Sequence, residues 1–187
     1  MSTRDLVLTS LFAAIIVALG LVPPITLGFI AVPITAQTLG VMLAGVVLGA
    51  RRGAAAVLIV MVLVAVGLPV LSGGRGGLAV FAGPTAGFFI GWFFGALVTG
   101  YVSERLARAG QNAFAQFASF FLAAVLGGIV TVYAFGIVYL ATLGGTGFAK
   151  AFWGSLAFIP GDLIKAAIAA LAGRAVLAGY PLLPRQR

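Results

Sequence analysis

Asp162 and Lys165 lie three positions apart inside the last apolar stretch of the chain, which we expect to run from Phe152 to Leu177. The whole sequence has only three acidic residues, so an acid and a base in one apolar segment need a reason. A charged side chain at the centre of a bilayer costs about 2.5–3.5 kcal/mol on insertion scales. Residues three apart on a helix face the same side, so both charges can engage one polar ligand. The alternative is an ion pair that only fixes packing. We favour ligand recognition because a purely structural pair is costly in lipid.

The segment 22–38 is too apolar for a solvated loop, and its three prolines discourage a regular helix. Non-helical backbone is tolerated at membrane depth where it is buried in protein or lines a cavity. We therefore expect Thr35, Gln37 and Thr38 to present hydroxyl and amide groups to a cavity. A re-entrant turn in which these residues only cap the next helix is the alternative.

A second connector, residues 72–87, carries a run of glycines around Arg75. Glycines such as Gly74 and Gly76 permit tight turns and a close approach of backbone N–H groups to a ligand. No Gly-Lys-Ser/Thr follows, so the run is not a phosphate-binding P-loop. A small anion could meet Arg75 here, and the alternative is a flexible loop with a solvated arginine.

Pro160 and Gly161 precede the charged pair and allow a break in the last span. Proline suits the first turn of a helix, where its missing N–H is not needed. We expect a new helix to begin just before Asp162, whose charge then suits the positive end of the helix dipole.

The composition indicates that these elements lie in a lipid bilayer rather than in water. The 187 residues are 63% hydrophobic and 7% charged, whereas a soluble domain has about 25% charged residues. The chain is therefore predicted to be an all-α integral membrane protein. It has no cysteine and no histidine, which excludes disulfides, thiol nucleophiles, histidine catalysis and the usual zinc sites. We expect no metal site and no nucleic-acid partner, since the basic residues are scattered at the ends of apolar stretches.

Six apolar segments can serve as membrane spans in a single domain covering residues 1–187: Leu6–Val22, Thr38–Ala50, Ala54–Leu71, Thr85–Val102, Phe114–Leu143 and Phe152–Leu177. With both termini in the cytoplasm, the inner side receives Arg4, Arg51, Arg52, Arg105, Arg108, Arg174, Arg185 and Arg187. The outer loops receive only Arg75 and Lys150, as the positive-inside rule favours. A signal peptide is the alternative for the first segment, but Val22-Pro23-Pro24 offers no cleavage site.

Two further groups of residues have less specific patterns. Ala14 and Ala18 form a small-xxx-small face, which either packs inside the bundle or docks another membrane protein. Several aromatic residues could wall an apolar pocket, or belong to the core and the interfacial belt: Phe81, Phe88, Phe89, Trp92 and Trp153.

Taken together, these segments resemble the BioY family, the biotin-binding S components of energy-coupling factor (ECF) transporters. The resemblance covers nearly the whole chain and depends on four motifs in order: Val32-Pro-Ile-Thr-Ala-Gln-Thr38, Leu48-Gly-Ala-Arg-Arg-Gly-Ala54, Gly73-Gly-Arg-Gly-Gly-Leu78 with Gly83-Pro-Thr85, and Pro160-Gly-Asp-Leu-Ile-Lys165. It implies a six-helix bundle that captures biotin from outside under its outer loops. Two positions depart from the family pattern: Ala86 replaces a glycine and Phe88 a common tyrosine, so we assign no ligand contact to Phe88.

The resemblance also implies roles for the site. Asp162 would accept the ureido N–H groups of biotin, and Lys165 would donate to the ureido oxygen or balance Asp162. Arg75 or the backbone of the glycine-rich loop would meet the carboxylate of biotin. The full set expected to bind substrate is Asp162, Lys165, Gln37, Thr35, Arg75, Gly74, Gly76, Pro84 and Thr85.

Partners follow from the same resemblance. Ala14 and Ala18 best match the helix that meets the transmembrane coupling subunit. The chain has no nucleotide-binding motif, so uptake needs that subunit with a pair of ATPases, or an ion gradient in a solitary transporter with Asp162 as a proton site. We expect a prokaryotic cytoplasmic membrane protein that is not an enzyme and has no cofactor, with biotin as its transported ligand. An S component for another vitamin, an intramembrane lipid-modifying enzyme and an assembly protein are the competing interpretations.

Overall fold

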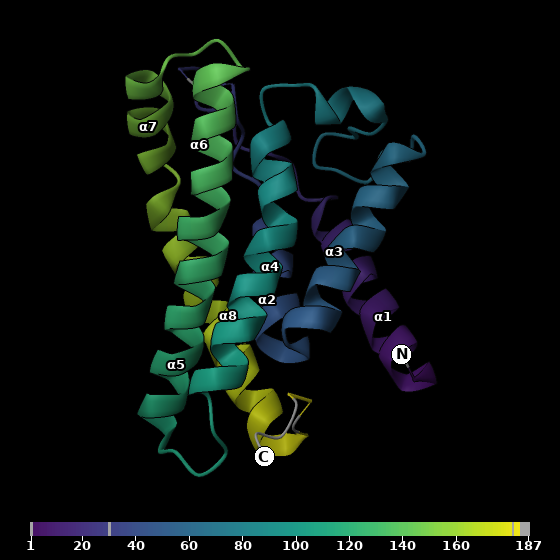
Figure 1. Cartoon of the computed structure of the whole chain (residues 1–187), viewed down its shortest axis with the longest axis vertical. Coiled ribbons are helices and arrows are strands. Elements are labelled where there is room, and N and C mark those ends of the chain that lie inside the picture. The colour runs from purple at the N-terminus through teal and green to yellow at the C-terminus, as the bar shows by residue number, and fades with distance from the viewer. Residues whose placement is uncertain (1, 30, 181, 184–187) are drawn as a thin grey trace.

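The computed structural model describes residues 2–29, 31–180 and 182–183 as a bundle of helices. Two connectors gather at one end, which we call the connector end (Figure 1). The first connector is residues 20–29 and 31–36, and the second is residues 66–85, which contain the short 3-10 helix η1 (Leu78–Phe81). The first helix begins, and the last helix ends, near the opposite end, which we call the terminal end (Figure 1). Within the described residues the regular β contacts are two isolated bridges, so the fold is all-helical as predicted.

The first three helices are α1 (Thr3–Leu19), α2 (Gln37–Leu48) and α3 (Ala50–Ala65). A sharp corner at Gly49, with φ +83°, joins α2 to α3 at the terminal end. Positive φ is the reason for a glycine there. The Glu104 carboxylate accepts the first backbone N–H of α3 at 2.9 Å, where the helix dipole favours an acid.

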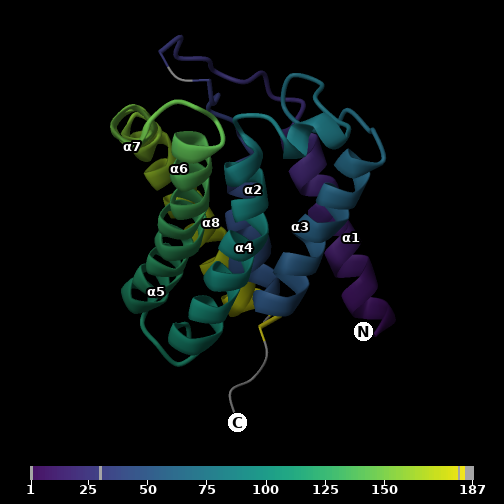
Figure 2. The ribbon, with the colours of Figure 1, turned by 45° about the horizontal axis from the view of Figure 1, so that its top comes forward.

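The next helices are longer. Helix α4 covers Ala86–Leu106. It is followed by one continuous helix made of α5 (Ala113–Val125), the π-helical segment η2 (Leu126–Thr131) and α6 (Val132–Thr142). In both views α1 and α3 lie on one side of α2 and α4, and α5, α6 and α7 on the other (Figures 1 and 2).

The last apolar segment is broken, as predicted. Helices α7 (Phe148–Leu156) and α8 (Ile159–Gly179) meet at an angle of 52°. Pro160 lies in the first turn of α8, where no intrahelical N–H bond is lost. The same turn contains Asp162, whose negative charge is stabilised by the helix dipole.

Helix length separates the predicted spans into two groups. Helix α4 and the 30-residue helix 113–142 are long and apolar enough to cross a membrane, and the bent pair α7–α8 makes a third. Helices α1, α2 and α3 have only 17, 12 and 16 residues. The third span was predicted at Ala54–Leu71, but the helix ends at Ala65 because the chain then turns into the second connector.

The core differs between the two ends of the bundle. Toward the terminal end the helices are joined by fully buried small residues on α2, α4, α5 and α8: Ala44, Ala96, Ala124, Ala169 and Ala170. Small side chains let helix axes approach closely, as in other membrane bundles. Toward the connector end larger aromatic side chains separate the helices, and a cavity forms there.

Candidate ligand-binding site

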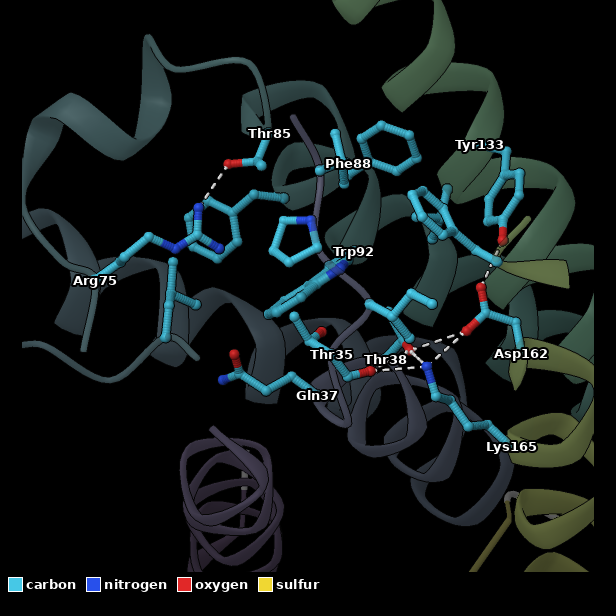
Figure 3. A pocket seen from close by; sticks show the side chains of 17 residues that line it. Thr35, Gln37, Thr38, Arg75, Thr85, Phe88, Trp92, Tyr133, Asp162 and Lys165 are labelled. Carbon is cyan, nitrogen blue, oxygen red and sulfur yellow. Dashed lines mark hydrogen bonds and ion pairs between the residues drawn. The ribbon is translucent and has the colours of Figure 1, made fainter. Parts of the chain in front are cut away.

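The cavity lies at the connector end between α2, α4, α6 and the start of α8 (Figure 3). Residues 32–35 and Arg75, from the two connectors, complete its wall. Its free volume is about 60 Å³. Ligand pockets usually have about 300–1,000 Å³, so this cavity is smaller than a typical ligand pocket.

The predicted charged pair lies at the right of the view in Figure 3 and is joined directly: Lys165 Nζ is 2.7 Å from Asp162 Oδ1. Lys165 Nζ also donates to the Thr35 carbonyl oxygen at 2.7 Å and to Thr38 Oγ1 at 2.9 Å. An ammonium group has three donors, and all three have acceptors here. Asp162 is 4% exposed, so the pair is compensated by protein rather than by water.

Tyr133 of α6 is a further hydrogen-bond partner of Asp162. Its hydroxyl donates to Asp162 Oδ2 at 2.6 Å, so each carboxylate oxygen holds a different partner. Tyr133 was not among the predicted site residues, because it lies 29 residues from Asp162 with no local pattern to join them. A tyrosine within a predominantly apolar span was the available signal.

Aromatic rings from α4 form the apolar wall. Phe88, Phe89 and Trp92 line the cavity, and the rings of Phe89 and Trp92 meet edge to face at 5.3 Å. Phe81 packs behind Phe89 at the same ring distance, while Trp153 is 70% exposed and away from the wall. Three of the five aromatic candidates therefore line the cavity, including Phe88, to which no contact had been assigned.

Arg75 supplies a second cationic group on the opposite side of the cavity (Figure 3). Its Nη1 donates to Thr85 Oγ1 at 3.2 Å and its Nε to the Ser72 carbonyl oxygen at 3.2 Å. Burial lowers the pKa of Arg75 from its ordinary value, although a guanidinium remains charged near neutral pH. Both of these acceptors are neutral, so the positive charge of Arg75 is suited to an incoming anion.

The side-chain amide of Gln37, which was predicted to bind substrate, is bonded to backbone groups of the protein in this structure. Gln37 borders the cavity, but its Nε2 donates to the carbonyl oxygens of Ile16 and Val70, both at 3.1 Å. Its Oε1 accepts the Ser72 backbone N–H at 2.9 Å. Both N–H donors of the amide are therefore engaged. The Gln37 side chain is 1% exposed and connects α2 to α1 and to the second connector.

The structure does not bring Gly74, Gly76 and Pro84 to the cavity wall, in contrast to the prediction. Backbone hydrogen bonds of 3.0 and 3.2 Å between Leu71 and Arg75 close a tight turn, and Gly74 lies at its exposed tip. Gly76 lies against the backbone of Gly67 and Leu68, just beyond α3, and Pro84 is exposed. From the predicted set in this connector, Arg75 and Thr85 alone line the cavity.

Ala14 and Ala18 lie on an exposed face of α1, away from the cavity. Val7 and Leu11 continue this face toward the terminal end and are 62% and 52% exposed. The two alanines therefore do not serve as a packing face inside the bundle, which was one of the two predicted uses.

Other cavity residues have no distinguishing signal in the sequence. They are apolar side chains that only the tertiary fold separates from the rest of the core: Val32, Leu71, Val132 and Phe158. Within the described residues no group of three or more acidic side chains could hold a metal ion.

Known proteins with similar sequences belong to one family. The chain matches the model of the BioY family over residues 1–182. It is 77% identical to the biotin transporter BioY of Rhizobium etli, with 98% of both chains covered. It is 51% identical to the biotin transporter BioY of Rhodobacter capsulatus, covering 92% of this chain and 93% of that one.

A solved structure has the same fold. It is the S-component for biotin from an ECF-type ABC transporter, and its TM-score with this chain is 0.86. The two sequences are 33% identical, and the match covers 94% of each chain.

Proposed function

The chain belongs to the BioY family, and from this premise we propose that it binds biotin in the cavity at the connector end and mediates biotin uptake. The observation that carries the proposal is the buried Lys165–Asp162 pair, which faces an aromatic wall in a membrane protein. The relatives are named as transporters, and transport is not an enzymatic function.

The chemistry of biotin matches the arrangement of the cavity. The ureido ring has two N–H donors and a carbonyl, which suit the Asp162 carboxylate and the Lys165 ammonium group respectively. The thiophane ring is apolar and would lie against Phe88 and Trp92. The valerate carboxylate would reach Arg75, whose side chain donates to neutral oxygens in this structure.

A cavity of this size requires a rearrangement before this ligand fits. Residues 32–35 cover the cavity, and Lys165 holds the Thr35 carbonyl oxygen at 2.7 Å. A ureido oxygen that accepts a hydrogen bond from Lys165 competes with this contact. Ligand entry would therefore release the cover from α8 and let it move outward.

Six spans with both termini in the cytoplasm remain our proposal for the topology of this single membrane domain. The spans would be formed by α1, α2, α3, α4, the continuous helix 113–142 and the bent pair α7–α8. The distribution of arginines and lysines supports this orientation, with the terminal end facing the cytoplasm. The membrane would be the prokaryotic cytoplasmic membrane, and no cofactor is proposed.

Energy for uptake would come from an ECF coupling subunit with a pair of ATPases. The protein of similar fold is an S-component from an ECF-type ABC transporter, and the exposed Ala14 and Ala18 suit a close helix contact with a coupling subunit. A solitary mode of transport is the alternative. Uptake of labelled biotin by cells with and without the ECF subunits separates the two modes.

The substrate itself is tested by mass spectrometry of the ligand released from detergent-purified protein. We expect biotin at close to one molecule per chain after growth with biotin. A purified, folded protein that neither carries biotin nor binds it on titration would overturn the proposal.

A further inference from the structure

Tyr133 extends a hydroxyl group from α6 to the Asp162 carboxylate (Figure 3). The O–H···O distance of 2.6 Å lies within the range of about 2.5–2.7 Å for hydrogen bonds to a charged oxygen, which are stronger than neutral ones. Tyr133 is 7% exposed, so water is a poor competitor for this bond. The hydrogen bond is therefore a stable part of the folded site.

The ring of Tyr133 is held from two sides. It meets the ring of Phe88 edge to face at 6.0 Å and the ring of Phe158 at 6.5 Å. Gly136, one turn further along α6, makes room for Phe88, because a Cβ atom there would overlap the Phe88 ring. These contacts fix the direction of the hydroxyl group toward Asp162.

The helix itself is adjusted directly before Tyr133. The π-helical segment η2 ends at Thr131, and Tyr133 is the second residue of α6. A π-turn accommodates one residue more than an α-turn and rotates the residues that follow by about 100°. The register of Tyr133 on the cavity face thus depends on this segment.

Three partners restrain the Asp162 carboxylate. Oδ1 accepts from Lys165 and, at 3.4 Å, from Thr38 Oγ1, while Oδ2 accepts from Tyr133, so rotation of the carboxylate would break at least one of the bonds. A carboxylate can accept about four hydrogen bonds, so acceptor capacity remains, chiefly on Oδ2. A group fixed in its binding orientation loses less entropy when a ligand arrives.

We propose that Tyr133 is a positioning residue for ligand recognition. It holds the Asp162 carboxylate in the orientation in which its remaining lone pairs receive the N–H donors of a cyclic urea. Tyr133 acts through Asp162 and does not need to touch the ligand. This inference rests on the proposed function, since it adds a residue to the same site.

The test is a double-mutant cycle on the purified full-length protein, with biotin affinity measured by isothermal titration. Tyr133→Phe removes only the hydroxyl group and should weaken biotin binding by about tenfold. In the Asp162→Asn background the same change should have an effect of less than about twofold, because the charged acceptor that the hydroxyl orients has gone. Tyr139→Phe is the matched control on α6. Its hydroxyl lies 3.5 Å from the Phe81 carbonyl oxygen, outside the cavity, and its loss should leave the affinity unchanged.

The outcomes separate this inference from the proposed function. Wild-type affinity in Tyr133→Phe, or the same fold loss with and without Asp162→Asn, overturns the positioning role alone. Absence of biotin binding by the wild-type protein overturns the proposed function instead.

A second substitution covers the case in which Tyr133→Phe does not fold. Replacement of Tyr133 by 4-aminophenylalanine keeps an N–H donor in place and should recover most of the affinity, whereas 4-fluorophenylalanine keeps the size without a donor and should not. Equal affinities for these two proteins would contradict the positioning role.

Discussion

Two ion pairs of this protein differ in their surroundings. Lys165 and Asp162 are 2.7 Å apart, with side chains 14% and 6% exposed, and they lie beside the cavity. Arg52 and Asp5 are 3.4 Å apart, with side chains 18% and 30% exposed, and they connect α1 to the start of α3. The first pair is short and enclosed, whereas the second is longer and more open to solvent.

The partners of the two pairs differ in the same way. The cavity pair is bonded to two side chains that line the cavity, those of Tyr133 and Thr38, and to one backbone group, the Thr35 carbonyl oxygen. Arg52 is bonded mainly to backbone, at the carbonyl oxygens of Leu48 and Leu182. Replacing a buried ion pair by apolar residues is often neutral or stabilising. We therefore attribute the cavity pair to ligand recognition and the peripheral pair to the folded structure.

Separate and joint neutralisation of the cavity pair is expected to have the largest effect. Asp162→Asn or Lys165→Met should each weaken biotin binding by well over tenfold. Each should also destabilise the protein by about 3–5 kcal/mol, because the remaining charge is buried without its partner. The double variant should recover much of the stability and none of the affinity. Thermal melting and biotin titration of all three proteins make the distinction, and recovery of affinity in the double variant would contradict a role in recognition.

Gln37→Ala should have the next largest effect, and mainly on stability. Three backbone groups in α1 and the second connector would lose their hydrogen-bond partner. The free energy of unfolding should therefore fall by about 2–4 kcal/mol. Gln116→Ala is a matched control, since this buried glutamine donates to the carbonyl oxygens of Arg108 and Ala109 away from the cavity. Both variants should melt at lower temperature, and only Gln37→Ala should alter biotin affinity. Equal effects of both on binding would rule out a specific link between Gln37 and the cavity.

Arg75→Met tests the other cation of the cavity. Loss of the proposed contact with the valerate carboxylate should weaken biotin binding by about five- to tenfold. The methyl ester of biotin has no carboxylate charge and should bind the variant and the wild type equally. Lys150→Met, at an exposed position of α7, provides the control. If the variant loses affinity for both ligands alike, Arg75 supports the wall of the cavity rather than the ligand.

The smallest effects are expected at the peripheral pair, where Asp5 precedes the first predicted span. Arg52→Gln should leave biotin affinity unchanged. The hydrogen bond from the Ser2 backbone N–H, with smaller help from the Ser2 hydroxyl and Arg52, lowers the pKa of Asp5 below its ordinary value of 3.8. A lowered pKa stabilises the folded state at any pH above the ordinary value, and this stabilisation is lost as the pH falls through the lowered pKa. Melting temperatures measured from about pH 5 down to about pH 2 should therefore fall slightly more steeply for wild type than for Asp5→Asn, and identical slopes would contradict this role of Asp5.

The sequence predicted the local features of the fold that depend on nearby residues. The hydrophobic composition indicates a helical membrane protein, and Pro160 marks the break before α8. The spacing of Asp162 and Lys165 puts both on one side of α8, where they form an ion pair. The break and the ion pair are each determined within about one or two helical turns, and the composition is a property of the whole chain.

Contacts between distant segments were not predictable in the same way. Tyr133 reaches Asp162 from another helix, after a π-helical segment with no clear sequence signature. Gln37 has the residue type of a ligand-binding group, but its neighbours at Ile16 and Val70 already use its donors. The glycine-rich turn places Arg75 at the cavity and Gly74 at an exposed tip, which depends on the direction of the turn and not on composition.

A structure determined with biotin bound would test the central claim most directly. We predict that the ureido N–H groups lie within hydrogen-bonding distance of the Asp162 carboxylate and the ureido oxygen near Lys165 Nζ. The valerate carboxylate should lie near Arg75. Biotin bound in the reverse direction, or outside this cavity with the Lys165–Asp162 pair unchanged, would contradict the account.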